Sequence, residues 1–383
     1  RVGGLYILSA LSLSVALASL VALAMTRAQE SPSPSGDVSP PPPPPFTQDM
    51  PVVMVAGGAG YIGSHVVEHL LSLGVYNVVV FDNLSTGHSD AVPSHPNLRF
   101  VQGDVRSDSD LDRVMEAYPV EYVMHFCALS LVGESVSQPL KYYDNNVVGT
   151  LRLLEAMVRH SVPHLVFSST AAVYGQAQPE PIREDTPTIP LNPYGGSKLA
   201  CEQMIRWTCE AHGLKAVALR YFNAAGASAT GDIGEDHHPE THLIPLILQV
   251  PNGKRDNIKV FGTDYPTEDG TCVRDYIHVS DLASAHALAL GHLAQTQPGF
   301  NAMNLGYGRG FSVRDVIDHA RSVTGEAIAA VDAPRRPGDP PTLVAEAGRA
   351  REVLQWVPEN DNLDSIIGSA WKWHESHPDG FKK

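Results

Sequence analysis

Cysteine is scarce in this sequence, with four residues among 383. Cys201 and Cys209 lie eight positions apart on one predicted helix, which separates them by about 12 Å along its axis, too far for a disulfide. No C-x-x-C pair and no cluster of histidine and cysteine has the spacing of metal ligands. We interpret His237 and His238, in a polar stretch, as surface residues. The sequence therefore predicts neither a disulfide framework nor a metal site.

Positive charge is also scarce. Lysine and arginine together number 27 against 42 aspartates and glutamates, so the formal net charge is -15. No basic cluster occurs in the body of the chain, which argues against nucleic acid as a main partner. Loops and single arginines can still bind phosphate groups locally. With 43% hydrophobic residues, the chain can bury a sizeable core as two domains or as one large α/β unit with a substrate lobe.

The first 46 residues differ from the rest of the chain. Residues 5–25 form an uncharged apolar run about as long as a membrane span. Residues 31–46 are rich in proline and serine, which favours a stiff, extended stem rather than a core. We interpret residues 1–46 as a signal anchor with a stem, or else as a cleaved signal peptide with a stem. Either interpretation predicts a membrane-anchored or secretory-pathway protein; a cytosolic catalytic domain is the alternative.

A nucleotide-binding pattern begins at residue 52. Residues 52–56, VVMVA, form an apolar run typical of a strand buried on both faces. They lead into Gly58-x-Gly60-x-x-Gly63, which opens an amphipathic helix, and a second strand ends at Asp82. Strand, glycine loop, helix, strand and terminal acid in this order are far more specific than the glycines alone. The glycines let the backbone approach a pyrophosphate, and Asp82 would bind ribose hydroxyls but repel a 2′-phosphate, so we predict NAD rather than NADP.

Strands and helices continue to alternate along the chain. Strands are predicted over residues 98–104, 121–128, 164–169 and 216–222, and helices over 109–118, 140–160 and 194–212. This order predicts an α/β fold with a doubly wound parallel (Rossmann) sheet. We assign residues 47–225 to an NAD-binding domain and 226–383 mainly to a smaller substrate-binding lobe, with some segments returning to the first domain. Asp104, Phe126 and Ala128 lie at or just after strand ends, where such sheets bind ligands.

A tyrosine and a lysine stand one helical turn apart at Tyr194 and Lys198. Residues four apart share a face of a helix, so the two side chains can meet. Taken alone, most such pairs are surface contacts. The alternative is a catalytic phenol beside a fixed cation, because a nearby positive charge lowers the pKa of a phenol. The strand over 164–169 ends just before Thr170, and parallel-sheet geometry brings that hydroxyl beside the same helix.

Together these motifs resemble one protein family. GGAGYIGSH, SSTAAVYG, NPYGGSK, LRYFNAAGA and FGTDYPTEDGTCVRDYIHVSDLA occur in the order typical of extended short-chain dehydrogenase/reductases, and most closely resemble the UDP-glucose (UDP-galactose) 4-epimerase family. The likeness runs from about residue 52 to the C-terminus. It implies that Tyr194 accepts the proton of the sugar 4-hydroxyl and that Thr170 bridges the two oxygens. It also implies that Lys198 binds the nicotinamide ribose and lowers the phenol's pKa, while bound NAD oxidises C4 only transiently.

The resemblance also carries over two sets of binding residues. The cofactor set, besides the tyrosine and lysine, is Gly57, Gly60, Tyr61, Ile62, Gly63, Asp82, Asn83, Asp104, Val105, Phe126, Ala128, Asn145 and Phe222. The UDP-sugar set, besides the threonine, is Asn223, His242, Leu243, Phe261, Arg274, Arg336, Asp339 and Leu343. Arg274 and Arg336 suit a pyrophosphate, because a guanidinium can bind two oxygens at once. We expect a homodimer and no metal ion.

Rival reactions are judged by the residues that they need. Related 4,6-dehydratases carry an Asp-Glu pair after the threonine, where this chain has Ala171 and Ala172, and decarboxylating relatives need a carboxylate there too. Both reactions are therefore disfavoured. A membrane-tethered, non-catalytic NAD-binding scaffold is a different interpretation, but such proteins commonly lose the tyrosine or the lysine. Ser130 stands where some epimerases have a lysine near the pyrophosphate. This difference either weakens NAD retention without changing the chemistry or is a tolerated variation.

The sugar has three candidates. UDP-glucose and UDP-galactose come first, and UDP-xylose and UDP-arabinose are the alternative, because membrane-anchored relatives with stems interconvert those pentoses. Leu343 matches a family position near C2 of the sugar, where tyrosine restricts the pocket and a smaller residue leaves room for a 2-acetamido group. We therefore predict additional activity on UDP-N-acetylglucosamine. The competing interpretation makes Leu343 a core residue of a strand with no contact to the sugar.

Overall fold

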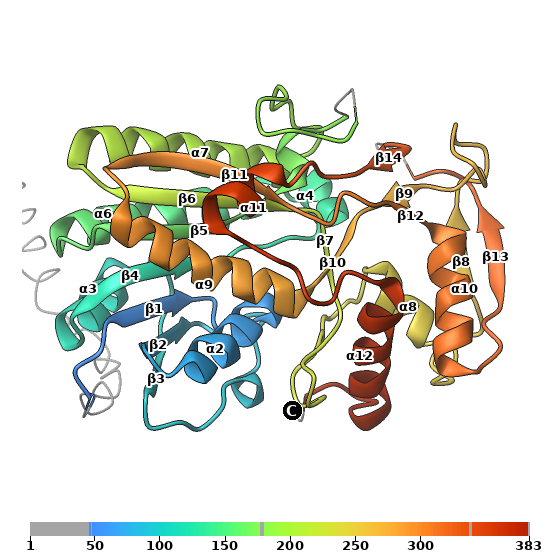
Figure 1. The fold of residues 1–383 in the computed structure, drawn as a ribbon, viewed down its shortest axis with the longest axis horizontal. Helices are drawn as coiled ribbons and strands as arrows, with labels where there is room; N and C mark the ends of the chain where they lie inside the picture. The colour runs from blue at the N-terminus through green and yellow to red at the C-terminus, as the bar shows by residue number, and fades with distance from the viewer. Residues whose placement is uncertain (1–45, 47, 177–179, 337–338, 382–383) are drawn as a thin grey trace, which may run out of the picture. The chain divides into compact units, whose positions relative to one another are not determined.

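A parallel sheet of seven strands forms the centre of the computed structural model, which describes residues 46, 48–176, 180–336 and 339–381 (Figure 1). The strand order is β11-β6-β5-β4-β1-β2-β3, and every neighbouring pair is parallel. The strands are β1 Val52–Ala56, β2 Asn77–Asp82, β3 Leu98–Gln102, β4 Val120–His125, β5 His164–Thr170, β6 Lys215–Tyr221 and β11 Gly299–Leu305. The chain runs outward from β1 to β3 and returns to β4 on the other side of β1, which confirms a doubly wound sheet.

Strand β1 shows why its sequence is apolar throughout. Successive side chains of a strand point to opposite faces. Val53 and Val55 join one hydrophobic core, and Val52, Met54 and Ala56 join a second core on the other face. All five side chains are buried, as expected for a parallel sheet that helices cover on both sides.

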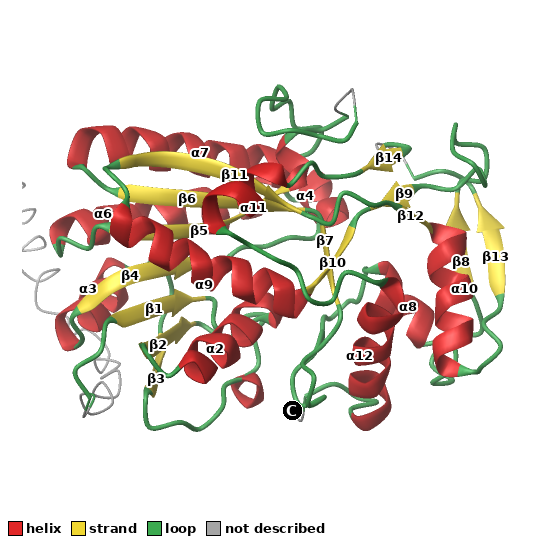
Figure 2. Cartoon of the chain, in the orientation of Figure 1, coloured by secondary structure: helices red, strands yellow, loops and turns green. Residues whose placement is uncertain are grey.

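Helices form a layer on each face of the sheet (Figure 2). The first layer comprises α2 Tyr61–Leu73, α9 Val279–Gln295 and α11 Gly348–Leu354. Their apolar side chains belong to the hydrophobic core that contains Val53. The second layer comprises α3 Asp108–Ala117, α6 Gly149–Arg159 and α7 Pro193–His212. Their apolar side chains belong to the hydrophobic core that contains Met54. Short segments are η1 Ser89–Ala91, α4 Val132–Ser137, α5 Pro139–Tyr142, the π-helix η2 Tyr143–Val148, and η3 Ala171–Val173. The helix predicted over residues 140–160 is confirmed as a continuous helical stretch over residues 139–159, in which the π-helical segment η2 lies between α5 and α6.

Smaller elements form a second region in the C-terminal half. Its strand pairs are β7 Asn223–Ala225 with β10 Tyr276–His278, β8 Ile258–Phe261 with β13 Ala330–Ala333, and β9 Val273–Arg274 between β12 Phe311–Ser312 and β14 Thr342–Leu343. Its helices are α8 Leu243–Leu248, α10 Val313–Thr324 and α12 Leu363–Ser376. Their apolar faces share a third core, which includes Ile247, Val316 and Ile367. This region supplies most of the residues expected to bind the UDP-sugar.

The two regions are interwoven along the chain. Strand β11 and helices α9 and α11 follow the first strands of the second region, yet they pack into the central sheet and its helical layer. Residues 42–383 form one compact unit, and the predicted domain boundary after residue 225 stays a prediction. The expected anchor and stem lie outside the described residues, apart from Phe46. Among the residues that the structure describes, no helix is long and apolar enough to cross a membrane.

Candidate functional site

The glycine loop joins β1 to α2 and lies against the end of β4. Gly57 N donates to Phe81 O at 2.8 Å, and Phe126 N donates to Ala56 O at 2.7 Å, which aligns three strand ends. A Cβ on Gly63 would lie 2.1 Å from Gly57 O, so the helix and the loop can approach this closely only with glycine there. Helix α2 begins after Gly60 without a side-chain cap and without an acidic residue in its first turn. Its N-terminus therefore suits an anion.

Asp82 ends β2 and holds the glycine loop from the side. Its carboxylate accepts hydrogen bonds from Ala59 N at 3.0 Å and Leu84 N at 2.8 Å. The residue is buried, and burial raises the pKa of this carboxyl, while the two backbone hydrogen bonds and His88 oppose the rise. A fixed acceptor at this strand end suits ribose hydroxyls, as the sequence predicts.

Asn83 and Asp104 form a second polar pair beside Asp82. Asn83 Nδ2 donates to Asp104 Oδ2 at 3.0 Å, and Arg106 donates to both oxygens of the same carboxylate at 3.0 and 2.8 Å. These hydrogen bonds lower the pKa of Asp104 to about 2, the largest contribution being that of Arg106. The carboxylate is therefore ionised at neutral pH. Arg106 was not predicted from the sequence, because no motif includes it.

Tyr194 and Thr170 come together at the end of β5. Asn192 caps α7 by accepting from Gly195 N at 2.9 Å, and Pro193 occupies the first turn. A Cβ on Gly195 would lie 2.4 Å from Ala172 O, so only glycine lets α7 approach the chain after β5 this closely. The Thr170 hydroxyl lies close enough to the Tyr194 phenol to lower its pKa. The predicted approach of this hydroxyl to this phenol is confirmed, and their catalytic role stays a prediction.

The electrostatics of Tyr194 differ from the prediction. Burial raises the pKa of the phenol, and the hydrogen bond with Thr170 only partly opposes that rise. The Lys198 ammonium donates to Ser168 O at 2.7 Å and lies 4.8 Å from the centre of the Phe167 ring. The expected lowering of the pKa is therefore wrong for the protein by itself, because Lys198 faces β5. Burial lowers the pKa of Lys198 to about 8.

Sequence reasoning missed the side chains that hold this helix in place. Asn146, in the π-helix, accepts from Leu129 N at 2.9 Å and donates to Leu129 O and Ser197 Oγ, each at 3.0 Å. This clamp holds Leu129 beside the π-helix, and β4 ends at His125, before the predicted residue 128. Its neighbour Asn145, which was predicted to bind NAD, donates to Asn146 Oδ1 at 3.0 Å. Two adjacent asparagines in a helix were the available signal, since asparagine disfavours helix interiors.

A buried ion pair joins α7 to the sheet. Glu202 lies one turn beyond Lys198 and accepts from Arg220 Nη2 at 2.5 Å, from Arg220 Nε at 2.9 Å and from Ser169 Oγ at 2.6 Å. Arg220 also donates to Tyr174 Oη at 2.9 Å. The network links α7, β5 and β6 below the catalytic pair. No local motif marks it, because Glu202 and Arg220 are 18 positions apart.

The structure gathers four of the predicted UDP-sugar residues. Arg336 Nε donates to Asp339 Oδ2 at 2.8 Å, and its guanidinium lies 5.3 Å from the centre of the Phe261 ring. Arg274 Nη2 lies 3.9 Å from Asp339 Oδ1. Two arginines therefore share one carboxylate. Such a cluster keeps a net positive charge, which suits a pyrophosphate.

Leu343 lies between this cluster and the catalytic pair. It pairs with Arg274 across β14 and β9, and its side chain packs with Phe222 against Val173, Tyr174 and Ile182. It is a half-buried strand residue. Both interpretations of Leu343 are therefore compatible with its position.

The remaining predicted residues lie in several places. Tyr61 Oη donates to Gly226 O at 2.7 Å, and Ile62 packs partly buried against the first core. Val105 is buried, and Ala128 is half-buried after β4. Asn223 begins β7, where its N–H donates to Asp275 O at 3.0 Å. His242 and Leu243 stand at the start of α8, where His242 contacts the buried Glu235 rather than the arginine cluster.

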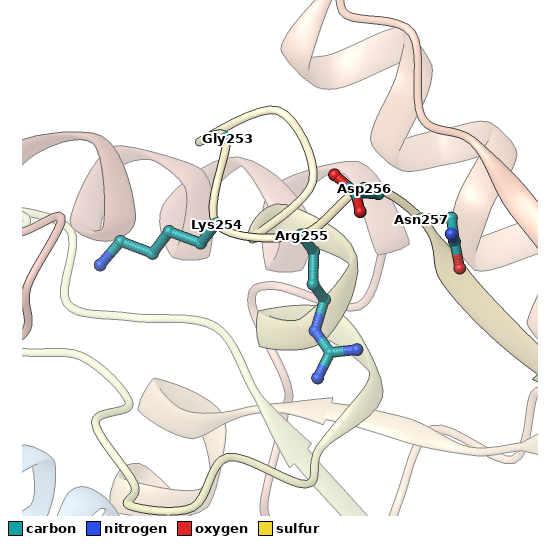
Figure 3. A pocket seen from close by; sticks show the side chains of 5 residues that line it. All are labelled: Gly253, Lys254, Arg255, Asp256 and Asn257. Carbon is teal, nitrogen blue, oxygen red and sulfur yellow. The ribbon is translucent and has the colours of Figure 1, made fainter.

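A surface hollow also occurs in the second region. Figure 3 shows its lining, Gly253, Lys254, Arg255, Asp256 and Asn257, in the turn between α8 and β8. Lys254 Nζ donates to Asp379 Oδ1 at 3.1 Å, and Arg255 Nε donates to Gln249 Oε1 at 3.0 Å. None of these residues belongs to the predicted site, so we assign the hollow to the shape of the turn.

Comparisons with known proteins point to one family. Residues 53–306 match the model of the NAD dependent epimerase/dehydratase family. A UDP-glucose 4-epimerase of Halalkalibacterium halodurans is 53% identical over 330 residues, which cover 86% of this chain and 97% of that protein. A solved UDP-glucose 4-epimerase is 50% identical with a TM-score of 0.84, covering 87% of this chain and 100% of the other. The enzyme of Bifidobacterium longum, solved with NAD+ and UDP, is 39% identical with a TM-score of 0.81, covering 86% and 100%.

Proposed function

The chain belongs to the NAD dependent epimerase/dehydratase family, and we propose that it is a UDP-glucose 4-epimerase, an isomerase that interconverts UDP-glucose and UDP-galactose. The approach of the Thr170 hydroxyl to the Tyr194 phenol, one turn from Lys198, carries this proposal. Ala171 and Ala172 follow the threonine, so the side chains next to it offer no carboxylate for dehydration. A 4-epimerase needs no such carboxylate.

The residues at the end of the sheet fit NAD. The uncapped N-terminus of α2 and the glycine loop suit a pyrophosphate, and Asp82 suits the adenosine ribose. A 2′-phosphate would meet two carboxylates, Asp82 and the ionised Asp104. When bound, NAD would supply a reversible two-electron acceptor for C4 of the sugar.

Residues of this chain would take up the proton of O4 and later return it. Tyr194 would accept it, and the Thr170 hydroxyl would bridge O4 and the phenol by hydrogen bonds. In the protein alone the raised pKa keeps this phenol protonated at neutral pH, so the positive charges of Lys198 and of bound NAD would have to lower that pKa before the phenol accepts the proton. Lys198 is buried beside β5, and its pKa of about 8 leaves most of its charge in place at pH 7.

The nucleotide side would hold UDP while the sugar turns. Arg274 and Arg336 would bind the pyrophosphate, with Asp339 fixing their orientation. Phe261 lies beneath the Arg336 guanidinium. We place Asn223, His242 and Leu243 on the nucleotide as well. A firm grip on UDP and few contacts to the hexose would let both faces of C4 reach the cofactor.

Replacement of the phenol oxygen tests the reaction. Tyr194→Phe should leave the fold and the NAD affinity nearly unchanged and lower kcat for UDP-galactose by more than about 10³-fold, because only the proton acceptor is lost. Tyr143→Phe, which removes an exposed phenol, is the matched control and should keep normal turnover. Near-normal turnover by Tyr194→Phe would refute the proposed chemistry.

Leu343 supports a second activity, on UDP-N-acetylglucosamine. Its side chain packs with Phe222 next to Tyr174, and leucine occupies less space than tyrosine. Leu343→Tyr should suppress epimerisation of the N-acetyl substrate and spare that of UDP-galactose. Equal loss on both substrates would show that residue 343 sets no size limit. Residues 47–383 assayed with UDP-xylose would test the pentose alternative in the same series.

Two further proposals concern partners. We propose that residues 5–25 insert into a membrane, on the basis of their uncharged apolar sequence. The full chain should then float with lipid vesicles, and residues 47–383 should not. We also propose a homodimer, which light scattering of residues 47–383 would test. A monomer at micromolar concentration would contradict it.

A further inference from the structure

Four potential metal ligands converge in the segment between β7 and α8. Glu235, His237, Glu240 and His242 each direct one carboxylate oxygen or ring nitrogen to a common point, and these four atoms lie within 4.8 Å of one another. Nothing in the reaction proposed above uses Glu235, His237 or Glu240. Their steps along the sequence, of two, three and two residues, follow no familiar metal motif, which explains why the sequence predicted none.

The two carboxylates in this cluster are shielded from water. The side chains of Glu235 and Glu240 are only 4% and 8% exposed. Glu240 Oε1 accepts from the backbone N–H groups of Thr241 and His242 at 2.6 and 2.7 Å. Its other oxygen, Oε2, is thereby turned toward the cluster, 3.8 Å from His237 Nδ1. Two buried carboxylates side by side require a positive charge between them.

The two histidines present their Nδ1 atoms to these oxygens. His237 Nδ1 lies 3.2 Å from Glu235 Oε1 but is buried and, among the described residues, makes no hydrogen bond of good geometry. His242 Nδ1 contacts the same oxygen of Glu235. The neighbouring carboxylates raise the pKa of both imidazoles against the opposing effect of burial. Protons therefore supply the positive charge when no cation is bound.

We propose that Glu235, His237, Glu240 and His242 bind one zinc-class divalent cation. Two imidazole nitrogens and two carboxylate oxygens form a suitable donor set, and four protein ligands are typical of a structural rather than a catalytic site. Metal–ligand bonds of about 2.1 Å place tetrahedral ligands about 3.4 Å apart. The four atoms lie within 4.8 Å of one another, so no pair needs to approach by more than roughly 1.4 Å to reach this geometry.

The cation would fasten this segment to the second region. Trp373, in α12, donates its Nε1–H to Glu235 O at 3.2 Å, and a Cβ on Gly234 would lie 2.2 Å from the Trp373 ring. The segment is therefore already pressed against α12 at one end. A metal bond to His242 would fix the other end, where α8 begins. Resting on the proposed function, this predicts that metal removal raises KM for the UDP-sugar more than it lowers kcat.

Direct metal binding tests the proposal without reference to turnover. The full chain, freed of metal with a chelator and passed over a desalting column, is titrated with Zn2+ against a chromogenic chelator. We expect one tightly bound ion per chain. His237→Ala and Glu240→Gln should each weaken binding by more than about 100-fold. His238→Ala is the matched control, because this neighbouring histidine is 58% exposed and outside the cluster.

Thermal unfolding of the same proteins separates a lost ligand from a lost fold. Zn2+ should raise the Tm of the parent chain and of His238→Ala, and leave the Tm of His237→Ala and Glu240→Gln unchanged. Circular dichroism should show the same helix content in all four proteins. The proposal is overturned if the parent binds no Zn2+ at micromolar concentration, or if His237→Ala binds it as tightly as the parent. Either result would leave a proton-bridged cluster and would not affect the proposed epimerase.

Discussion

The end of the central sheet and the C-terminal region position their functional side chains in different ways. At the sheet end, Asp82 and Thr170 are the last residues of two parallel strands, and Tyr194 stands in the first turn of a helix. In the C-terminal region, Arg274 lies in a two-residue strand and Arg336 on a loop, and both are oriented by side-chain contacts with Asp339. The first arrangement follows from backbone geometry. The second depends on pairs of charges, so substitutions there should have graded effects.

The largest effect expected at the sheet end concerns Lys198. Lys198→Met should lower kcat by about 10³-fold, because it removes the cation that we propose to bind the nicotinamide ribose. The same variant should be more stable at pH 7, since burial lowers the pKa of Lys198 to about 8. Between pH 8 and 10.5 the unfolded chain binds more protons at this lysine, so stability of the parent rises with pH.

Thermal unfolding at two pH values checks the lysine prediction. The Tm advantage of Lys198→Met over the parent should be larger at pH 7 than at pH 9.5. Lys215→Met, at the start of β6, is the control and should show neither the loss of activity nor the pH-dependent gain. A Lys198→Met enzyme that is inactive but no more stable than the parent at pH 7 would contradict the effect of burial.

The buried ion pair beneath the catalytic helix should matter next. Glu202→Gln leaves Arg220 buried without its countercharge, which should lower the free energy of unfolding by about 3 kcal/mol. Asp112→Asn removes a carboxylate that pairs with Arg159 at the surface, 2.8 Å away, and should lower the stability far less, because exposed ion pairs contribute little. Urea unfolding measures both. Equal losses of unfolding free energy would show that the buried pair of Glu202 contributes no more to stability than the surface pair of Asp112.

The arginine cluster should respond in a graded way. Arg274→Ala should weaken UDP binding by about 30-fold, because the side chain is 13% exposed and a charged hydrogen bond contributes about 2 kcal/mol there. Arg336 is 56% exposed, so Arg336→Ala should weaken it less. Calorimetry with UDP compares the two, and the NAD affinity should stay unchanged in both. A larger loss of UDP affinity in Arg336→Ala than in Arg274→Ala would contradict this prediction.

The same contrast explains what the sequence could predict. Residues 52–56 and 77–82 are strands with the predicted bounds, because an apolar run flanked by glycine or a terminal acid has few other structures open to it. The contact of Tyr194 with Thr170 follows from that topology. Asn146, Glu202 and the cluster around Glu235 were missed, because partners far apart in sequence meet only after the sheet and its helices have packed. The orientation of Lys198 toward Ser168 O also depends on packing.

The smallest effect expected concerns the hydrogen bond between Thr170 and Tyr194. That bond lowers the pKa of the phenol, while burial, the larger effect, raises it. Thr170→Val removes the hydroxyl and keeps the shape of the side chain, so the pKa should rise further. A base works only when deprotonated, so the rising limb of the pH profile of kcat should move to higher pH. The shift should be less than about one unit, which limits the loss of kcat at neutral pH to about tenfold.

Thr170→Ser keeps the hydroxyl and should retain the parent profile. If Thr170→Val lowers kcat equally at every pH, Thr170 positions the sugar and does not tune the phenol.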